Sequence, residues 1–482
     1  MRLNLKFIPY DRRLLKAIYS FSQDRKSDLY LVGGALRDCI LARDKDNPDY
    51  DFAIKKNAIS FGRALAKKLK CAFVVLDKEH GSCRLVKKYK DKIYTFDFTD
   101  FRGKDIGDDL KHRDFTINAI ALNLKNSLSG SDFSFTLIDP QGGVLDIKNK
   151  LIRMVGSEAF AEDPLRILRA FVFSSSLGFA IDKGTLKAAK LNKEKLTLVS
   201  AERIREELFK IFATPRAYDC LIALDKIKAL DIIFPEIKKM RRIGQGPYHH
   251  LDVWQHTLET VKQLEVVFEE NKDEDIKAYL ETAISSDRRR KAILKFGAFL
   301  HDFGKPKTLR KDKGRTTFHG HERVGLRIAE EIGRRIKLSN DELNSLRKIV
   351  LWHLRPGYLA DSKNPTARAK FRFFRDAGVE SLGILLLSLA DQRSTKGPFT
   401  TFKTRQQHEK VVASLIKEHL MKGKEKKQAR LLNGDEVMKR FKLPPSPLVG
   451  RVLSLIEELQ AIGKIKNKEE AFKSAAKVIR AK

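Results

Sequence analysis

The apolar positions of the chain change from a mixed strand and helix period to a purely helical period. Short apolar runs at residues 29–32, 73–76 and 93–96 are typical of β-strands, with helix-like stretches between them. Beyond about residue 160 apolar side chains recur at helical spacing, as in the segment around Leu208, and strand patterns almost vanish. The pattern predicts an α+β fold, in which a small α/β head precedes a mostly α-helical remainder.

The length of 482 residues is too great for a single ordinary core and favours several domains. The Gly- and His-rich stretch at residues 244–250 is typical of a boundary before a second functional unit, and a basic segment at 422–427 leads into a last helical part. Four domains are expected: a head at 1–155, a helical neck at 156–240, a body at 241–420 and a basic helical tail at 421–482.

The formal net charge of +34 predicts a polyanionic partner, because a polyanion lowers the self-repulsion of such a surface. A solvated lysine-rich surface without a specific partner is the alternative. No apolar run approaches the roughly 20 residues of a membrane span, and the first residues lack a secretory signal, so a cytoplasmic protein without a membrane partner is expected.

A glycine pair follows the first apolar strand and opens a helix-like segment that carries an arginine one turn later. Gly33 and Gly34 would let backbone N–H groups approach phosphate oxygens, and Arg37 could bind the same anion. A turn that only satisfies backbone geometry is the alternative reading of the glycine pair. The segment is therefore a candidate binding site for a nucleoside triphosphate.

Two carboxylates follow at i and i+2 on the next predicted strand. Asp49 and Asp51 would share one face of that strand and could hold two Mg²⁺ ions for an in-line displacement at phosphorus. Asp97, on a later strand, is the candidate for a third acid, although a structural aspartate is an equal alternative. Asp44 and Asp46 have the same spacing in a polar loop and are weaker rivals.

Six ordered sequence blocks resemble the class II CCA-adding tRNA nucleotidyltransferases and the related bacterial poly(A) polymerases. Together these blocks are far more specific than any one of them alone. They are LVGGALRD at 31–38, DYD at 49–51, HRDFTINAIAL at 112–122, DPQGGVLD at 139–146, EDPLRILRA at 162–170 and ERIREEL at 202–208. Ala42 departs from the family pattern, which usually has glycine there.

The resemblance implies the roles of further residues in the head and neck. Gly34 and Arg37 would contact the phosphates, the DYD carboxylates would bind Mg²⁺, and three arginines would contact the incoming nucleotide: Arg113, Arg166 and Arg169. Asp163 could accept a hydrogen bond from an exocyclic amine while Arg166 donates to the neighbouring ring nitrogen, an order that cytosine and adenine share. Alternatively, Asp163 and the following proline cap a helix.

Seven of the eleven histidines lie between residues 249 and 353, and six residues form the ordered pattern H…HD…H…H…D. Neutral imidazoles and carboxylates bind Mg²⁺ or a transition metal, and such an ion can generate hydroxide for phosphoester hydrolysis. The pattern resembles an HD phosphohydrolase domain, and His319 is a rival for one of the ligands. The candidate ligands are His256, His301, Asp302, His321, His353 and Asp391.

The resemblance implies a template-independent RNA nucleotidyltransferase that uses CTP and ATP to add CCA, or only CC or A, to the 3′ end of tRNA. By the same resemblance, residues 156–240 would be a neck for nucleotide recognition and RNA binding, 241–420 the HD phosphohydrolase domain, and 421–482 a tail that binds tRNA. The HD domain would add phosphatase or 2′,3′-cyclic phosphodiesterase activity, unless it serves only as an inactive RNA-binding body. A poly(A) polymerase is the closest rival. An RNA-binding protein with an inactive head, or an HD hydrolase with a regulatory head, is a more distant hypothesis.

Overall fold

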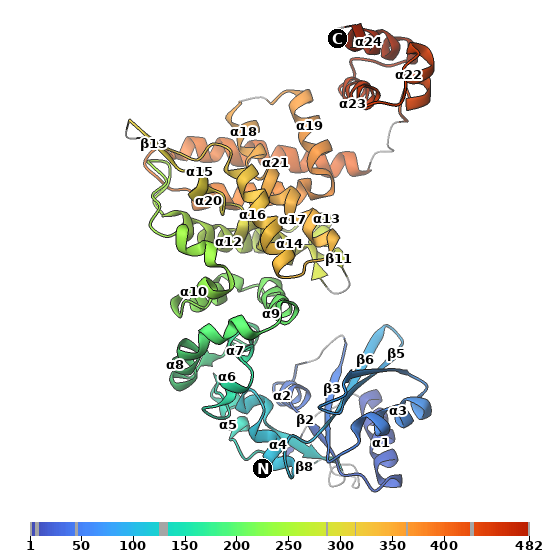
Figure 1. Cartoon of the computed structure of the whole chain (residues 1–482), viewed down its shortest axis with the longest axis vertical. Coiled ribbons are helices and arrows are strands. Elements are labelled where there is room, and N and C mark those ends of the chain that lie inside the picture. Colours follow the sequence, from blue (N-terminus) through green and yellow to red (C-terminus); the bar gives the residue numbers. More distant parts are fainter. Residues whose placement is uncertain are drawn as a thin grey trace. The chain divides into compact units, whose positions relative to one another are not determined.

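The computed structural model describes residues 2–4, 9–43, 47–124, 134–285, 288–313, 315–362, 365–424 and 429–480 (Figure 1). The chain divides into two compact units. Unit 1 comprises Met1–Glu207 and Ala223–Ile233, and unit 2 comprises Leu208–Ile222 and Phe234–Lys482. The four finer boundaries expected from the sequence stay predictions.

An eight-stranded mixed sheet forms the centre of unit 1. Its strand order is β1-β8-β7-β2-β3-β6-β5-β4, and only β3 and β6 run parallel to each other. The strands expected at 29–32, 73–76 and 93–96 are confirmed as β2, β4 and β6. The strands are β1 (Arg2–Asn4), β2 (Leu29–Val32), β3 (Asp49–Ile54), β4 (Ala72–Asp77), β5 (Ser82–Tyr89), β6 (Lys92–Asp100), β7 (Ala121–Asn123) and β8 (Ser134–Ile138).

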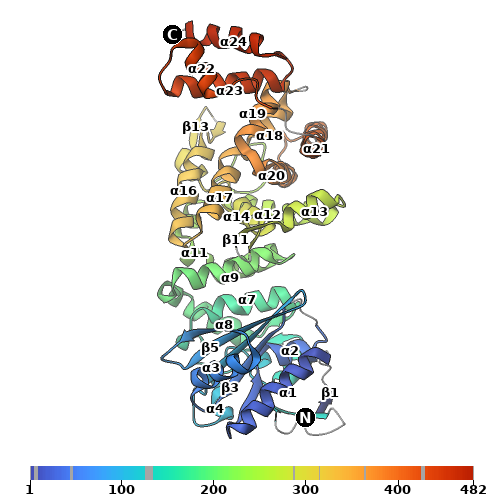
Figure 2. The ribbon, with the colours of Figure 1, turned by 90° about the vertical axis from the view of Figure 1, so that its right-hand side faces the viewer.

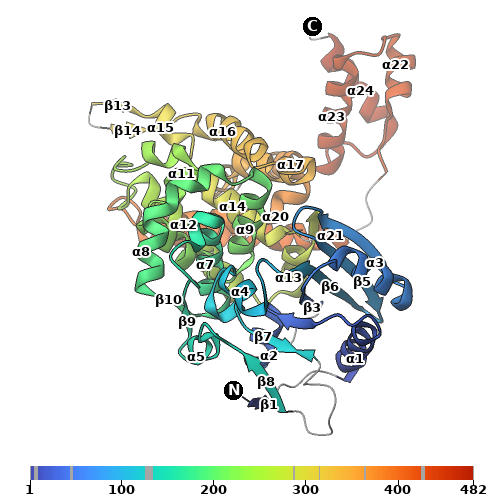
Figure 3. The same ribbon diagram turned by 60° about the horizontal axis from the view of Figure 1, so that its bottom comes forward.

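Two helices cover one face of this sheet, as Figure 3 shows for α1 (Pro9–Asp24) and α3 (Ala58–Leu69). α3 packs on β4, β5 and β6, and it touches α1 through the rings of Phe21 and Phe61. A Cβ at Gly62 would lie 2.4 Å from Cys83 Sγ, so only glycine permits this close approach of helix and sheet. Part of the opposite face is covered as well, because Val32, Ala53 and Ala121 belong to an apolar cluster with Leu110 of α4 (Ile106–Lys111).

The remainder of the described chain is mostly helical, which confirms the expected α+β fold. The helix predicted around Leu208 is α9 (Ala201–Ala213), and the described strands beyond residue 160 have at most three residues. Within the described ranges, no helix combines the length and the apolar character needed to cross a membrane.

Helices that pack around α20 (Ser381–Ser394) form much of the core of unit 2 (Figure 2). α20 buries apolar side chains all around its axis, because four helices pack against it: α12 (Val253–Glu270), α14 (Arg290–Leu300), α17 (Asn340–Trp352) and α21 (Phe402–Lys424). α14 and α17 approach closely at Gly297, where a Cβ would lie 2.5 Å from Ile349 Cγ2. α16 (His321–Arg335) packs against α17.

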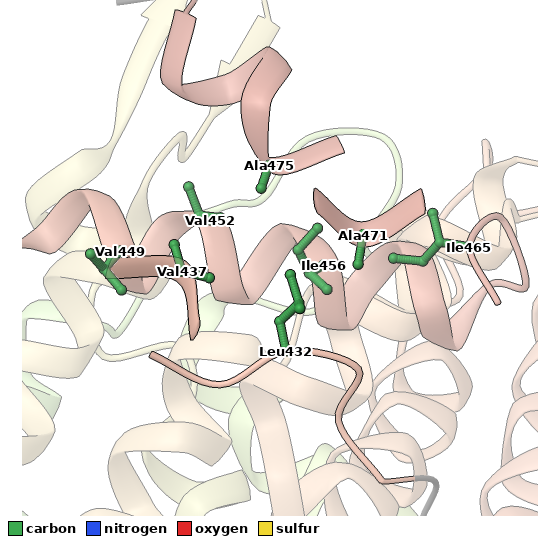
Figure 4. Packing of buried hydrophobic residues seen from close by; sticks show 8 residues of the cluster. All are labelled: Leu432, Val437, Val449, Val452, Ile456, Ile465, Ala471 and Ala475. Atoms are coloured by element: carbon green, nitrogen blue, oxygen red, sulfur yellow. The ribbon is translucent and has the colours of Figure 1, made fainter. Parts of the chain in front are cut away.

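The last three helices, α22 (Gly434–Phe441), α23 (Pro447–Ala461) and α24 (Lys468–Arg480), share an apolar cluster of their own (Figure 4). The buried members of this cluster are Leu432, Val437, Val449, Val452, Ile456, Ile465, Ala471 and Ala475. We call residues 429–480 the tail module. Part of the basic segment expected at 422–427 lies outside the described residues.

Candidate functional site

The face of the head sheet that α1 and α3 leave uncovered carries a row of charged side chains. Asp51 on β3 stands opposite Asp97 on β6, which in turn stands opposite Arg84 on β5. Arg84 Nε and Nη2 each donate to the Asp97 carboxylate at 2.7 Å. Asp97, the candidate for a third acid, therefore lies beside Asp51 with both oxygens bound by an arginine, and its catalytic role stays a prediction. The rivals Asp44 and Asp46 lie outside the described residues.

Gly33, the first glycine of the candidate triphosphate-binding segment, lies next to this row of acids. Its φ of +76° is in the left-handed region, and a Cβ there would lie 3.3 Å from Asp51 Oδ2 and 3.1 Å from Arg113 Nη1. Arg113 Nε and Nη2 also donate to Asp109 Oδ2 at 3.2 and 3.1 Å. Gly34 begins α2 (Gly34–Ile40) immediately afterwards. The structure thus gathers a carboxylate, a guanidinium and a tight glycine turn, the groups that a metal-bound triphosphate requires.

Arg37 and Arg169 are the two ends of a buried hydrogen-bond chain. Arg37 Nη1 donates to Asn118 Oδ1 at 2.6 Å, and Asn118 Nδ2 donates to Asp114 Oδ1 at 3.0 Å. Arg169 Nε and Nη2 donate to the other oxygen of Asp114 at 2.9 and 2.7 Å. Burial raises the pKa of Asp114, but the charge of Arg169 and the hydrogen bonds from Asn118, Arg169 and Phe115 N together outweigh it, so the net shift is downward. Both arginines stabilise the framework here, and their contact with a nucleotide stays a prediction.

Asp163 and Arg166 contact different groups in this structure. Asp163 Oδ1 accepts from Leu165 N at 3.2 Å, and Asp163 Oδ2 accepts from Arg203 Nη2 at 2.7 Å. Arg166 Nη2 donates to the His112 carbonyl at 2.6 Å, and the helix α7 (Arg166–Leu177) begins at this arginine. The base-selecting pair therefore stays a prediction. Arg203 is a partner that sequence reasoning missed, although it stands in the ERIREEL block.

The six residues of the H…HD…H…H…D pattern come together in unit 2. His256, His321 and Asp391 lie in α12, α16 and α20, and the other three lie directly after the ends of α14 and α17. They form two groups whose ligand atoms lie within 4.8 Å of one another: His256, His301 and Asp391, and Asp302, His321 and His353. We call these six residues the HD cluster. All except Asp391 are buried, and the rival His319 is exposed and belongs to neither group.

The ring nitrogens of the HD cluster are arranged in a way that suits the binding of a cation. The Nδ1 atoms of His301, His321 and His353 lie 2.6, 2.9 and 2.7 Å from backbone carbonyls, which can only accept, so each Nδ1 carries the proton. The Nε2 atoms of His321 and His353 then present lone pairs to each other at 3.2 Å. Two facing lone pairs repel unless a proton or a metal ion lies between them, so the donor set fits a divalent metal.

Charges around Asp302 keep it ionised. Burial raises the pKa of Asp302, but His301 and Lys305 outweigh it and hold the pKa well below its usual range. Lys305 Nζ lies 2.6 Å from Asp302 Oδ2 and donates to Gln245 Oε1 at 2.6 Å. Burial lowers the pKa of His353 to about 3, so this imidazole is neutral and available as a ligand. Sequence reasoning missed Lys305, although its i+3 spacing from Asp302 was a usable signal.

Family models match three successive parts of the chain. The Poly A polymerase head domain matches residues 29–153, the "Probable RNA and SrmB- binding site of polymerase A" matches 178–240, and the HD domain matches 253–396. An A-adding tRNA nucleotidyltransferase of Deinococcus radiodurans is 32% identical over 92% of this chain and 93% of its own length. A CC-adding tRNA nucleotidyltransferase of Thermus thermophilus is 29% identical over 92% of each chain.

Solved structures share the fold along almost the whole chain. A CCA-adding enzyme in complex with ATP has a TM-score of 0.66 at 21% identity, and the match covers 98% of this chain and 96% of the other. The Thermotoga maritima CCA-adding enzyme complexed with tRNA has a TM-score of 0.62 at 22% identity, with coverage of 98% and 96%. A mixed-sheet head with paired acids, followed by a helical part with an HD cluster, defines a nucleotidyltransferase fused to an HD domain. The chain belongs to the tRNA nucleotidyltransferase and poly(A) polymerase family, which confirms the resemblance noted from its motifs.

Proposed function

We propose that this protein adds nucleotides from CTP, ATP or both to the 3′ end of tRNA and so builds all or part of the CCA terminus. The observation that carries the proposal is the position of Asp51, the second acid of the DYD block, whose carboxylate lies with Arg113 beside the turn at Gly33. The Deinococcus and Thermus relatives, named as A-adding and CC-adding enzymes, each match 92% of this chain, which supports the choice of tRNA as the acceptor.

The residues of the head can divide the work of an in-line displacement. Asp49 and Asp51 would hold Mg²⁺, which lowers the pKa of the attacking 3′-hydroxyl and neutralises the leaving pyrophosphate. The 3′-hydroxyl would lose its proton to solvent, its oxygen would form a bond to the α-phosphorus, and the bond from the α-phosphorus to the pyrophosphate oxygen would break. Arg113 would bind the triphosphate, and the backbone at Gly33 leaves room for its oxygens. The hydrogen-bond chain from Arg37 to Arg169 would hold α2, which begins directly after Gly33, in place before the substrate arrives.

The products formed on defined acceptors test this proposal. Transcripts of one tRNA ending before, within and after CCA are incubated with CTP, ATP or both, and the new 3′ ends are sequenced. Addition of CCA, of CC alone or of the final A supports the proposal and decides among its forms. Long adenosine tracts on any RNA 3′ end would instead favour the poly(A) polymerase.

We also propose a second activity, metal-dependent phosphoester hydrolysis at the HD cluster. The specific observation is the pair of imidazole lone pairs of His321 and His353 facing each other, which a metal ion would satisfy. Water would form a bond to phosphorus, and the bond from phosphorus to the ribose 3′-oxygen would break, leaving a free 3′-hydroxyl and inorganic phosphate. Such a reaction would restore the nucleophile that the head needs. Release of phosphate from a 3′-phosphorylated RNA in the presence of Mg²⁺, Mn²⁺, Ni²⁺ or Co²⁺ tests it.

A further inference from the structure

Two exposed aromatic side chains of unit 2 lie in contact with each other. Tyr248 and Phe399 are 58% and 59% exposed, and their ring centroids are 5.6 Å apart with an interplanar angle of 87°. Single exposed aromatics are common on protein surfaces, whereas a pair held together from two distant segments is not explained by chance exposure.

Backbone contacts join the two segments that carry these rings. Gly397 N donates to Tyr248 O at 2.9 Å, and Phe399 N donates to Pro247 O at 3.1 Å. Thr400 Oγ1 donates to Tyr248 O at 2.9 Å as well. A Cβ at Gly397 would lie 2.2 Å from the Tyr248 carbonyl carbon, so glycine is required for this approach. The two rings are therefore presented by a fixed backbone arrangement.

The segment of Tyr248 is anchored in the HD cluster on both sides of the tyrosine. Gln245 accepts a hydrogen bond from Lys305, which also contacts Asp302. The His249 ring lies 4.8 Å from the His256 ring, measured between centroids. Tyr248 thus stands between two residues that face the cluster, while its own side chain faces solvent.

The segment of Phe399 is anchored in the cluster as well. Ser394 Oγ, at the end of α20, lies 3.0 Å from His256 Nδ1 and donates to the Asp391 carbonyl at 2.7 Å. The side chain of Asp391 is 26% exposed, whereas the side chains of His256 and Asp302 are each 1% exposed. The HD cluster therefore meets solvent at Asp391, on the helix that leads into the Phe399 segment.

We propose that Tyr248 and Phe399 form a stacking platform for the terminal nucleobase of an RNA 3′ end whose phosphoester lies at the HD cluster. This inference rests on the phosphohydrolase proposed above and names its substrate class, an RNA end with a base rather than a simple phosphomonoester. Every nucleobase has a π face, so aromatic rings bind single-stranded RNA ends without sequence preference, and each stacked base changes affinity by about 10- to 100-fold.

The experiment compares two RNA oligonucleotides that differ only at the last residue. Both carry a 3′-phosphate, and one of them has an abasic terminal ribose. The ratio of kcat/KM for the base-bearing RNA to that for the abasic RNA is measured for the parent, Tyr248→Ala, Phe399→Ala and Tyr248→Phe. The parent should prefer the base-bearing RNA, the alanine variants should lose about 10- to 100-fold of that preference, and Tyr248→Phe should keep it. Phe402→Ala is the matched control, because Phe402 is 72% exposed but is not part of the platform.

The outcomes separate this inference from the function on which it rests. If the parent releases phosphate and every variant keeps the parent's preference for the base-bearing RNA, the platform alone is overturned. The same holds if Phe402→Ala lowers this preference as much as Tyr248→Ala and Phe399→Ala do. Absence of phosphate release from both RNAs and from p-nitrophenyl phosphate, with each of the four metals, overturns the phosphohydrolase and the platform together.

Discussion

Gly33 lies between two groups on which nucleotide addition is proposed to depend. Gly33→Ala would place a Cβ near Asp51 Oδ2 and Arg113 Nη1 and would force an L-residue to adopt a φ of +76°. The backbone of Gly33, with a φ of +76° and a ψ of −137°, is in a region almost exclusive to glycine, and this alone costs another residue about 1–3 kcal/mol. Displacement of the carboxylate or the guanidinium should lower the single-turnover rate of nucleotide addition by about 10- to 100-fold.

Gly378→Ala is the matched control for this prediction. Gly378 has a φ of +59° and a ψ of −131°, close to the +76° and −137° of Gly33, and a Cβ there would meet only the end of the Lys348 side chain, with Nζ at 3.1 Å. Both variants should lose similar thermal stability, whereas only Gly33→Ala should lose most of its nucleotide addition. Equal losses of addition in the two variants would show that Gly33 matters for folding and not for the site.

The predicted base-selecting pair, Asp163 and Arg166, can be tested by replacing Arg166 and, separately, Arg203, the present partner of Asp163. If Asp163 and Arg166 recognise the hydrogen-bond order shared by cytosine and adenine, Arg166→Ala should permit use of UTP or GTP. Arg203→Ala removes the present partner of Asp163 and leaves Arg166 in place, so it should retain the choice of C and A. The measurement is competition among all four triphosphates. A uniform loss of rate in Arg166→Ala, without any new base used, would contradict the recognition role.

Single residues also show what a sequence can and cannot reveal. The acids at 49 and 51 were identifiable because their spacing on a strand is a local pattern. The bond between Arg37 and Asn118 joins residues 81 positions apart, and the bond between Arg169 and Asp114 joins residues 55 apart. No local period encodes such partners, so these framework contacts could not be predicted from the sequence, and the contact of both arginines with a nucleotide stays a prediction.

At the scale of helices and strands, the sequence predicted whether a segment is a helix or a strand better than it predicted which elements lie side by side. β2, β3, β4 and β6 follow from apolar runs, and the order of the eight strands does not, because non-adjacent segments decide it. Ala42 shows the same difference between what the sequence indicates and what the structure explains. The family motif indicated that glycine is usual at this position, and the structure supplies the reason, a φ of +51°.

The tail module has a core that no other described element shares, so its helices should respond together to a core mutation. Ile456 is 2% exposed, and Ile456→Ala should destabilise the module by about 2–5 kcal/mol, the usual cost of such a cavity. Hydrogen exchange measured by mass spectrometry should become faster in α22, α23 and α24 and stay unchanged in α12. Arg451→Ala, an exposed position on α23, is the control. Faster exchange in α12 would show that the module is not an independent unit of stability.

For the whole molecule, the net charge of +34 bears on how any comparison of variants is made. Binding to RNA phosphates releases counterions, and a protein with 6–10 such contacts loses about 10³–10⁵ in affinity between roughly 50 and 200 mM salt. A variant that loses one lysine or arginine near the RNA would change this dependence without touching either site. Rates and affinities of parent and variants are therefore comparable only at one ionic strength.

The two candidate sites belong to different units, since the paired acids lie in unit 1 and the HD cluster lies in unit 2. His301→Ala should abolish phosphate release from a 3′-phosphorylated tRNA, because loss of one ligand lowers metal affinity by about 10- to 100-fold or more. Nucleotide addition to the same tRNA with a free 3′-hydroxyl should persist. Asp51→Asn should do the reverse. The decisive substrate is the 3′-phosphorylated tRNA given with CTP and ATP. The parent should extend it, neither variant should extend it alone, and a mixture of the two variants should restore extension because the dephosphorylated tRNA can pass between them. Full extension by His301→Ala would refute the role of the HD cluster in preparing the acceptor end.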